Sequence, residues 1–424
     1  MLIKDIKSFI SDTVLYTVFN LLNKAIPFLL LPFIVRMVSK EDFGIYSLFV
    51  STEALLIPVI TLNIHNALSA HYYDDSIKLD EYISTIFVSV LGFTLFFLLT
   101  SLCLPKSIAS LTGLTKFSFF LSICTASVLA LTGMISNFYR LKRNPTRYGV
   151  FMIAQSLLLL LSIITFCYIQ PTSIYLIYGK LAFSLLFIIV CIVVLKREKL
   201  LLLTFNVFYF KKAFYFSLPT VLYSLSAFLF LSSDRFLINY FLGVESVGIY
   251  AGIFQLSSLI SILGMSLNAA WMPWLFENLK KQTDDNNKLI IKLSYLLITL
   301  FFICGTLYCL VFKYVAQTVL PPSFHAYMYI AYPLIFCYVF EGIYLIVSPY
   351  LFYKEATRYN GLIGLVVAVF NISLNIVLIP KYGLVGTAYS TLSTWILLAT
   401  LFFIFSNRVH PMPWLYFLNK EKNI

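Results

Sequence analysis

Three ionisable residues interrupt long apolar segments of the sequence: Lys24, Glu53 and Glu341. Lys24 lies near the middle of the first such segment, where a buried charge costs about 2.5 to 3.5 kcal/mol. Tyr16 and Asn20 precede it at intervals of four residues, so the three side chains share one face of a helix. A basic group facing an aqueous cavity would bind an anionic substrate such as a pyrophosphate. Snorkelling, or pairing with a carboxylate on another helix, explains Lys24 equally well.

The two acidic residues suggest ion coupling. Glu341 lies on a helical stripe with Tyr338 and Tyr344, and Glu53 is a weaker candidate of the same kind. A carboxyl group inside an apolar segment can exchange a proton during transport, or it can simply be the partner of Lys24.

Other polar residues lie inside or at the ends of apolar segments. They are Arg36, Lys180, Asp234, Arg235, Asn371 and Asn375. The neighbours Asp234 and Arg235 are typical of an interfacial charge cluster, with gating or substrate contact as the alternative. Arg36 and Lys180 are close enough to segment ends to snorkel. The two asparagines are four residues apart, and such amides more often bond neighbouring helices than a substrate.

No constellation typical of an enzyme or a metal site is found. The four histidines are dispersed and fit no catalytic or phosphate-binding motif. His65 and His71 share one segment with several acidic residues, which is typical of a solvated loop. The seven cysteines lack metal-type spacing. We therefore expect no catalytic residue, no metal and no cofactor, and transport driven by a gradient, by the membrane potential or by downhill substrate flow.

The elements that hold these residues are predicted to be membrane-spanning helices. Of 424 residues, 60% are hydrophobic and 11% charged, with a mean hydropathy of +0.91, whereas a soluble domain has roughly 25% charged residues. Apolar segments of about 20 residues recur along the chain, each long enough to cross a bilayer. The predicted spans are 12–36, 43–64, 82–104, 117–139, 148–170, 172–195, 213–240, 248–270, 289–312, 328–352, 361–379 and 384–406. The longest polar stretch between them, residues 277–288, is predicted to be a loop. The fold class is an all-α polytopic membrane protein of about twelve helices.

The positive charge predicts topology. The net charge of +12 is spread in short clusters between apolar segments, which argues against a nucleic-acid partner. With the N-terminus in the cytoplasm, most Lys and Arg residues outside the spans fall on the cytoplasmic side, as the positive-inside rule expects. We expect a multi-pass protein of the bacterial inner membrane, in contact with membrane lipid, with both termini cytoplasmic.

An internal repeat predicts two related halves. Placing residues 31–46 over residues 235–250, an offset of 204, aligns Glu41 with Glu245 and Gly44 with Gly248, together with three further identities. Both segments join the first two spans of a six-span half, and their glycines would permit a tight helical-hairpin turn. We expect an N-terminal six-helix bundle at 1–200 and a C-terminal one, with a short cytoplasmic tail, at 201–424.

Three stretches resemble the Wzx-type polysaccharide flippases of the multidrug/oligosaccharidyl-lipid/polysaccharide exporter superfamily. They are PFIVRMVSKEDFGIYSLF at 32–49, SDRFLINYFLGVESVGIY at 233–250 and NISLNIVLIPKYGLVGTAYST at 371–391. The resemblance implies two pseudo-symmetric bundles around a central cationic cavity. It also implies translocation of undecaprenyl-pyrophosphate-linked oligosaccharide units to the periplasmic face for O-antigen or other surface polysaccharide. A polysaccharide polymerase and a chain-length regulator of the same pathway are candidate partners that the sequence leaves open. Lys24 best matches the cavity-lining cations, followed by Arg36 and Arg235.

Three other classes of protein compete with this interpretation. A multidrug exporter of the same superfamily is the nearest, and only the motif similarity argues against it. An O-antigen polymerase, which is an enzyme, carries a large external loop as a family, whereas the loops expected here are short. A structural scaffold would not need Lys24 and Glu341 in the middle of spans.

Overall fold

The structure is a computed structural model that describes residues 2–103, 111–281, 283–354, 356 and 358–416. The side chains of residues 2–14, 24, 27 and 358 lie outside this description. Over the described residues the secondary structure is helical, without a β-strand. Twelve helices are long and apolar enough to cross a membrane, which confirms the prediction of an all-α polytopic protein with about twelve spans.

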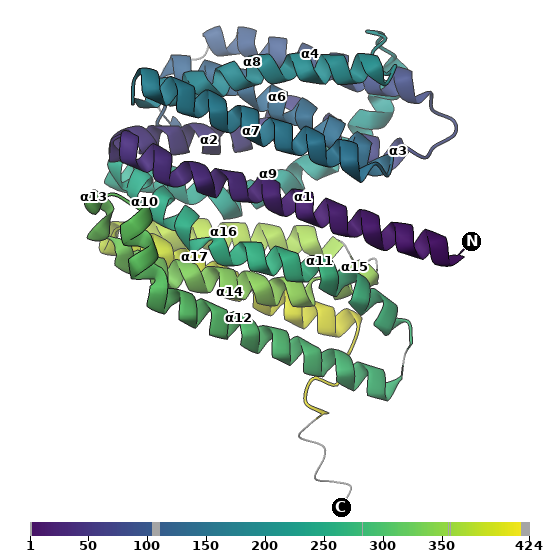
Figure 1. Ribbon diagram of the computed structural model, residues 1–424, viewed down its shortest axis with the longest axis vertical. Helices are drawn as coiled ribbons and strands as arrows, with labels where there is room; N and C mark the ends of the chain where they lie inside the picture. Colours follow the sequence, from purple (N-terminus) through teal and green to yellow (C-terminus); the bar gives the residue numbers. More distant parts are fainter. Residues whose placement is uncertain (1, 104–110, 282, 355, 357, 417–424) are drawn as a thin grey trace, which may run out of the picture. The chain divides into compact units, whose positions relative to one another are not determined.

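The contacts divide the chain into two units, residues 1–251 and 252–424. The first unit contains α1 (Leu2–Met37), α2 (Lys40–Thr61), η1 (Ile64–Asn66), α3 (Leu68–His71), α4 (Leu79–Cys103), α6 (Lys116–Leu141), α7 (Pro145–Ile169), α8 (Ser173–Arg197), α9 (Val207–Leu242) and the first half of α10 (Val244–Ser257). Helix α6 is its centre, since it contacts α2, α4, α7 and α8. Figure 1 labels the helices of this unit.

The second unit is built around α14 (Ala331–Val347), which contacts α11, α12 and α17. Its other elements are α11 (Leu259–Leu279), α12 (Asp284–Val319), α13 (Pro322–His325), η2 (Met328–Ile330), α15 (Pro349–Tyr353), α16 (Arg358–Tyr382) and α17 (Leu384–Val409). Helices α16 and α17 form an antiparallel pair joined at Gly383, whose positive φ of 59° suits the turn because glycine has no Cβ.

Two predicted boundaries are wrong. The span predicted at 248–270 falls on two helices, because the helix is interrupted at Ser258, between α10 and α11. The loop predicted at 277–288 is mostly helical, since α11 continues to Leu279 and α12 begins at Asp284, where Thr283 caps its first turn. Polar residues continue a helix beyond its apolar segment because the backbone hydrogen bonds continue into water. The division after residue 200 predicted from the spans stays a prediction.

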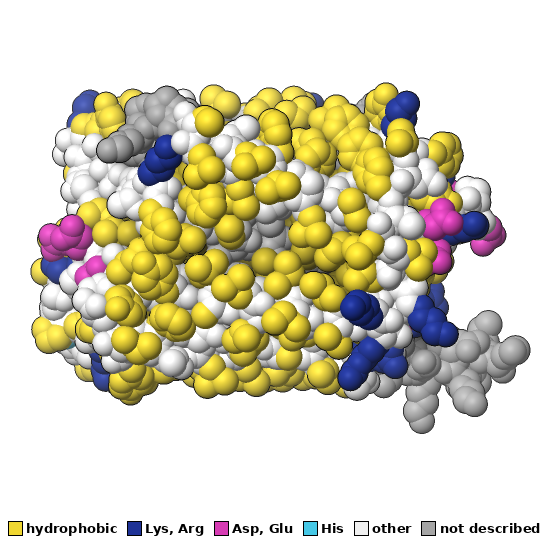
Figure 2. Space-filling view, turned by 90° about the horizontal axis from the view of Figure 1, so that it is seen from above, with side chains coloured by type: hydrophobic (Ala, Val, Ile, Leu, Met, Phe, Trp, Pro, Cys, Tyr) yellow, Lys and Arg dark blue, Asp and Glu magenta, His cyan; other side chains and the backbone are white. Residues whose placement is uncertain are grey.

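The surface has the pattern of a membrane protein. Figure 2 shows one face on which hydrophobic side chains cover the middle while Lys, Arg, Asp and Glu gather near the ends. Large side chains such as Leu95, Leu161 and Ile189 are more than half exposed on their helices. Contact with lipid tails makes such exposure favourable, whereas in water it would mark an aggregation site.

The two repeat segments touch each other within the first unit. A Cβ added to Gly44 of α2 would lie 2.0 Å from the carbonyl oxygen of Val244, and one added to Gly248 of α10 would lie 1.9 Å from that of Lys40. The contact is reciprocal: at the repeat offset of 204, position 44 meets 244, the counterpart of 40, and position 40 meets 248, the counterpart of 44, as in a two-fold interface. Lys40 also pairs with Glu245 at 2.6 Å. Both glycines lie inside helices, so they permit close helix crossing and not the hairpin turn predicted for them.

Candidate functional site

A buried ion pair joins α2 to α8 in the first unit. Glu53 is 1% exposed and Lys180 is 5% exposed, and the Lys180 ammonium donates to a carboxylate oxygen of Glu53. Thr125 of α6 lies beside the same carboxylate. The pair therefore lies where the three helices α2, α6 and α8 meet.

Aromatic rings line the approach to this pair. The ammonium nitrogen of Lys180 is 6.0 Å from the ring centroid of Tyr46 and 5.7 Å from that of Phe49. Tyr46, Phe49 and Glu53 are three and four residues apart on α2, so one face of that helix presents the rings and the carboxylate together. The electron-rich ring faces attract the ammonium group.

Burial makes the Glu53–Lys180 pair sensitive to any change of charge. Taking each ion out of water costs several kcal/mol. Mutual attraction and hydrogen bonding offset this desolvation cost only while both partners are charged and in contact. Loss of one charge leaves the other uncompensated inside the helical bundle.

The predicted polar stripe of α1 contacts a neighbouring helix. The Asn20 Oδ1 accepts a hydrogen bond of 2.6 Å from the Tyr148 hydroxyl of α7, and Asn23 accepts one from Ser156. The rings of Tyr16 and Tyr148 pack edge to face at 5.2 Å. These contacts fix α1 on α7. The Lys24 side chain, which belongs to the same stretch, lies outside the described residues.

Other predicted residues of the first unit lie toward helix ends. Asp234, buried on α9, pairs with its neighbour Arg235 at 2.9 Å, and Arg235 also donates to the Leu231 carbonyl at 3.0 Å. The pairing fits the predicted charge cluster. Arg36 is exposed in the last turn of α1.

The second unit holds the predicted asparagines and Glu341. The Asn371 amide donates to the Thr394 hydroxyl of α17 at 3.1 Å, and the fully buried Asn375 amide donates to the side-chain Oδ1 of Asn371 at 3.0 Å. Asn371 thus bonds across the α16–α17 interface, whereas the Asn375 donor bond stays within α16. Glu341 lies half-buried on α14. Its pairing with Lys24, a residue of the first unit, stays a prediction.

The segment between α2 and α4 differs from the solvated loop that was predicted. His65 is 6% exposed and its Nδ1 lies 3.1 Å from the Thr61 hydroxyl; burial lowers the pKa of His65 to about 4. Asp74 pairs with Lys212 of α9 at 2.6 Å, and hydrogen bonds from Lys212 and Ser76 hold the pKa of Asp74 well below its usual range. The segment folds onto the bundle, since its η1 contacts α4, α6 and α9 and its α3 contacts α6.

Sequence reasoning missed the partner of Glu53. Lys180 was predicted to snorkel from a span end, but it is buried against Glu53. The signal was available in the sequence, since the two residues carry opposite charges and both lie inside apolar segments. Their contact depends on α2 and α8 being neighbours, which hydropathy does not reveal.

A family comparison matches most of the chain. The family model described as polysaccharide biosynthesis protein matches residues 9–279. An uncharacterised membrane protein of Haemophilus influenzae is 24% identical over 299 residues, which are 65% of this chain and 67% of that protein.

Solved structures share the fold at low sequence identity. An inward-facing multidrug resistance MATE family transporter of the MOP superfamily has a TM-score of 0.73 at 13% identity, covering 93% of this chain and 94% of its own. The lipid II flippase MurJ, in an inward closed conformation, has a TM-score of 0.72 at 16% identity, covering 93% and 87%. The MATE multidrug transporter DinF-BH has a TM-score of 0.67 at 14% identity, covering 95% of both chains.

Proposed function

Because this chain belongs to the family of polysaccharide biosynthesis proteins, we propose that it flips lipid-linked oligosaccharide units across the membrane. The observation that carries the proposal is the family match over residues 9–279 of a chain with twelve span-length helices. The fold shared with a lipid II flippase adds support, because that protein also handles a lipid-linked substrate. The proposed cargo is an undecaprenyl-pyrophosphate-linked repeat unit of O-antigen or another surface polysaccharide, moved from the cytoplasmic to the periplasmic face of the inner membrane.

The proposed substrate path uses cations for the anionic head group. Lys24 holds the pyrophosphate, and Arg36 and Arg235 assist, since phosphate oxygens accept charge-assisted hydrogen bonds from both side-chain types. Asn20, Asp234 and Asn375 complete the predicted set of contacts. The lipid tail stays in the bilayer, so the protein needs to shield only the pyrophosphate and the sugars from hydrocarbon.

Glu53 and Glu341 are the proposed ion-coupling groups. A proton taken up by Glu53 cancels the charge that holds Lys180, so the closed state of the ion pair loses its stabilisation and α2 can shift on α8. In the proposed cycle the halves 1–200 and 201–424 rock against each other in alternating access. A gradient or the membrane potential supplies the energy.

The proposed topology places both termini in the cytoplasm, where the positive-inside rule puts most of the Lys and Arg residues. There the chain receives its substrate from cytoplasmic glycosyl transfer to the lipid carrier. A polymerase and a chain-length regulator are the proposed partners on the opposite face, because they consume the translocated units.

Deletion of the gene in its host tests the proposal. We expect surface polymer to be lost and lipid-linked repeat units to accumulate, with recovery by the wild-type gene. The Lys24→Ala variant should restore much less polymer at equal protein level. Lys292→Ala is the matched control, because Lys292 is an exposed lysine on α12 outside the proposed path. Single repeats reaching the surface unpolymerised would instead identify a polymerase.

Drug export is the second candidate, favoured by the TM-scores of 0.73 and 0.67 with multidrug transporters. An exporter would leave the polysaccharide intact when deleted and would raise sensitivity to cationic dyes and antibiotics. Measuring dye efflux in the same deletion strain therefore separates the two functions.

A further inference from the structure

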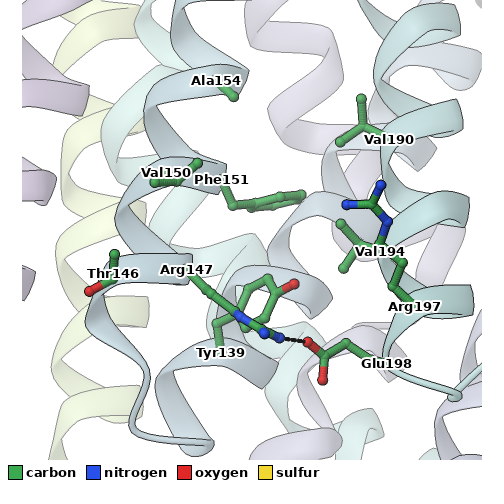
Figure 3. Close-up of a pocket in the computed structure, with 10 residues that line it drawn as sticks. All are labelled: Tyr139, Thr146, Arg147, Val150, Phe151, Ala154, Val190, Val194, Arg197 and Glu198. Atoms are coloured by element: carbon green, nitrogen blue, oxygen red, sulfur yellow. Dashed lines mark hydrogen bonds and ion pairs between the residues drawn. The ribbon is translucent and has the colours of Figure 1, made fainter.

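A pocket between α7 and α8 has one charged end and one apolar end. Its volume is about 430 Å³, and it is lined by Tyr139, Thr146, Arg147, Val150, Phe151, Ala154, Val190, Val194, Arg197 and Glu198. This set is called the α7–α8 pocket below. Figure 3 shows Arg147 and Glu198 in contact at one end, and Ala154 and Val190 at the other.

The pocket crosses the boundary between headgroups and hydrocarbon. Apart from Tyr139 of α6 and Glu198, which follows α8, its residues lie in the first three turns of α7 and the last three turns of α8. Eight residues of helix rise about 12 Å. The charged end lies at the ends of both spans, on the side that the positive-inside rule assigns to the cytoplasm. Val150 is 62% exposed and Ala154 is exposed as well, so the apolar side of the pocket opens toward lipid tails.

The residues in and beside the α7–α8 pocket carry an excess of positive charge. Glu198 accepts from both Lys142 and Arg147, so one carboxylate faces two cations and neutralises only one of them. The Arg197 guanidinium turns back along α8 toward Val190, and among the described residues no carboxylate or hydrogen-bond acceptor pairs with it. A guanidinium beside valines at the membrane boundary favours an anion with an apolar part.

We propose that the α7–α8 pocket binds an acidic phospholipid. The phosphate lies between Arg147 and Arg197, and one acyl chain runs along Val150, Ala154 and Val190. Basic pockets between transmembrane helices on the cytoplasmic side are suited to such headgroups. Arginine suits the phosphate because its planar fork donates two parallel hydrogen bonds. The site is independent of the transport proposal, since none of its residues belongs to the proposed substrate path.

Native mass spectrometry of the purified protein, titrated with phosphatidylglycerol, tests this inference. Arg197→Gln should weaken binding about fivefold, since each such cation contributes about that factor. It should leave folding unchanged, because Arg197 has no partner in the described structure. Lys196→Gln is the matched control: Lys196 is the exposed neighbour on the same helix but does not line the pocket. Ala154→Phe, which fills the apolar end, should weaken binding without changing the charge.

The same titration can overturn the proposal. Equal loss of phosphatidylglycerol in Lys196→Gln and Arg197→Gln would show non-specific surface attraction. Equal binding of phosphatidylcholine by the wild-type protein would exclude recognition of the acidic headgroup. Displacement of phosphatidylglycerol by inorganic phosphate would identify a site for a soluble anion, and unchanged binding by Ala154→Phe would exclude the acyl-chain groove.

Discussion

Gly44 of α2 and Gly248 of α10, 204 positions apart in the sequence, pack backbone against backbone. The neighbouring carbonyl oxygens of Val244 and Lys40 occupy the space where their side chains would be. Because backbone atoms of a helix cannot move aside individually, this crossing admits only glycine. It also brings together the two copies of the internal repeat.

Gly44→Ala should therefore destabilise the protein by at least about 2 kcal/mol, the usual cost of overpacking against atoms that cannot yield. Thermal unfolding in detergent measures the effect. Gly92→Ala is the control, because Gly92 is a helical glycine of α4 with no atom within 4 Å of an added Cβ. If the two variants unfolded at the same temperature, the close crossing would be refuted.

Removing either charge of the Glu53–Lys180 pair should reduce stability by about 3 to 5 kcal/mol, because the remaining ion stays buried without compensation. The double variant Glu53→Leu with Lys180→Met should recover most of that loss. Asp285→Asn, which removes one partner of an exposed pair, serves as control and should have no measurable effect.

The same double variant separates structure from ion coupling. A pair that couples transport to ions predicts a folded double variant that fails to restore surface polysaccharide. Full restoration at normal protein level would mean that the pair only holds α2 on α8.

His65 should make stability depend on pH. Its pKa is about 4 in the folded protein and 6.5 in its ordinary state, so between these values the unfolded chain binds a proton that the folded chain does not. The contribution of neutral His65 to the free energy of unfolding is fully present above pH 6.5. It is lost as the pH is lowered toward 4, by on the order of 3 kcal/mol in total.

Thermal unfolding of the wild type and of His65→Asn at pH 7.5 and pH 5 checks this expectation. The wild type should lose more stability at pH 5 than the variant, which has no group titrating there. Equal losses in the two proteins would place the pH dependence elsewhere.

The two asparagines of α16 should differ in their effect on helix packing. Asn371→Ala removes the bond to Thr394 across the helix interface and should cost about 1 kcal/mol. Asn375→Ala deletes the same number of atoms but removes only a bond within α16, so its effect should be smaller. Unfolding temperatures of the two variants compare them directly, and a larger loss for Asn375→Ala would contradict this assignment.

Hydropathy was sufficient to predict the helices, because a span must be long and apolar wherever it lies in the bundle. It could not predict the interruption between α10 and α11, which falls at Ser258 and not at a proline or a glycine. Similarly, the repeat identified Gly44 and Gly248 but suggested a turn, since a sequence pattern does not say which helices cross. The family comparison places the chain among the polysaccharide biosynthesis proteins and the solved structures share its fold, whereas flipping and the O-antigen substrate stay proposals.

The candidate site was only partly predictable for the same reason. Glu53 was recognised as a candidate because a charged side chain inside an apolar segment costs free energy. Identifying Lys180 as its partner requires knowing which helices are neighbours. Similarly, Asn20 was grouped with Tyr16 and Lys24 on one face of α1, and only the structure places Tyr148 opposite it.

The most direct measurement of the central claim is the sidedness of the lipid-linked repeat unit in spheroplasts while the protein is depleted. A membrane-impermeant lectin or glycosidase reports the fraction exposed on the outer face. The proposed flippase predicts that this fraction falls as the protein disappears while the total amount of lipid-linked unit rises. An unchanged outer fraction during complete depletion would contradict the proposed function.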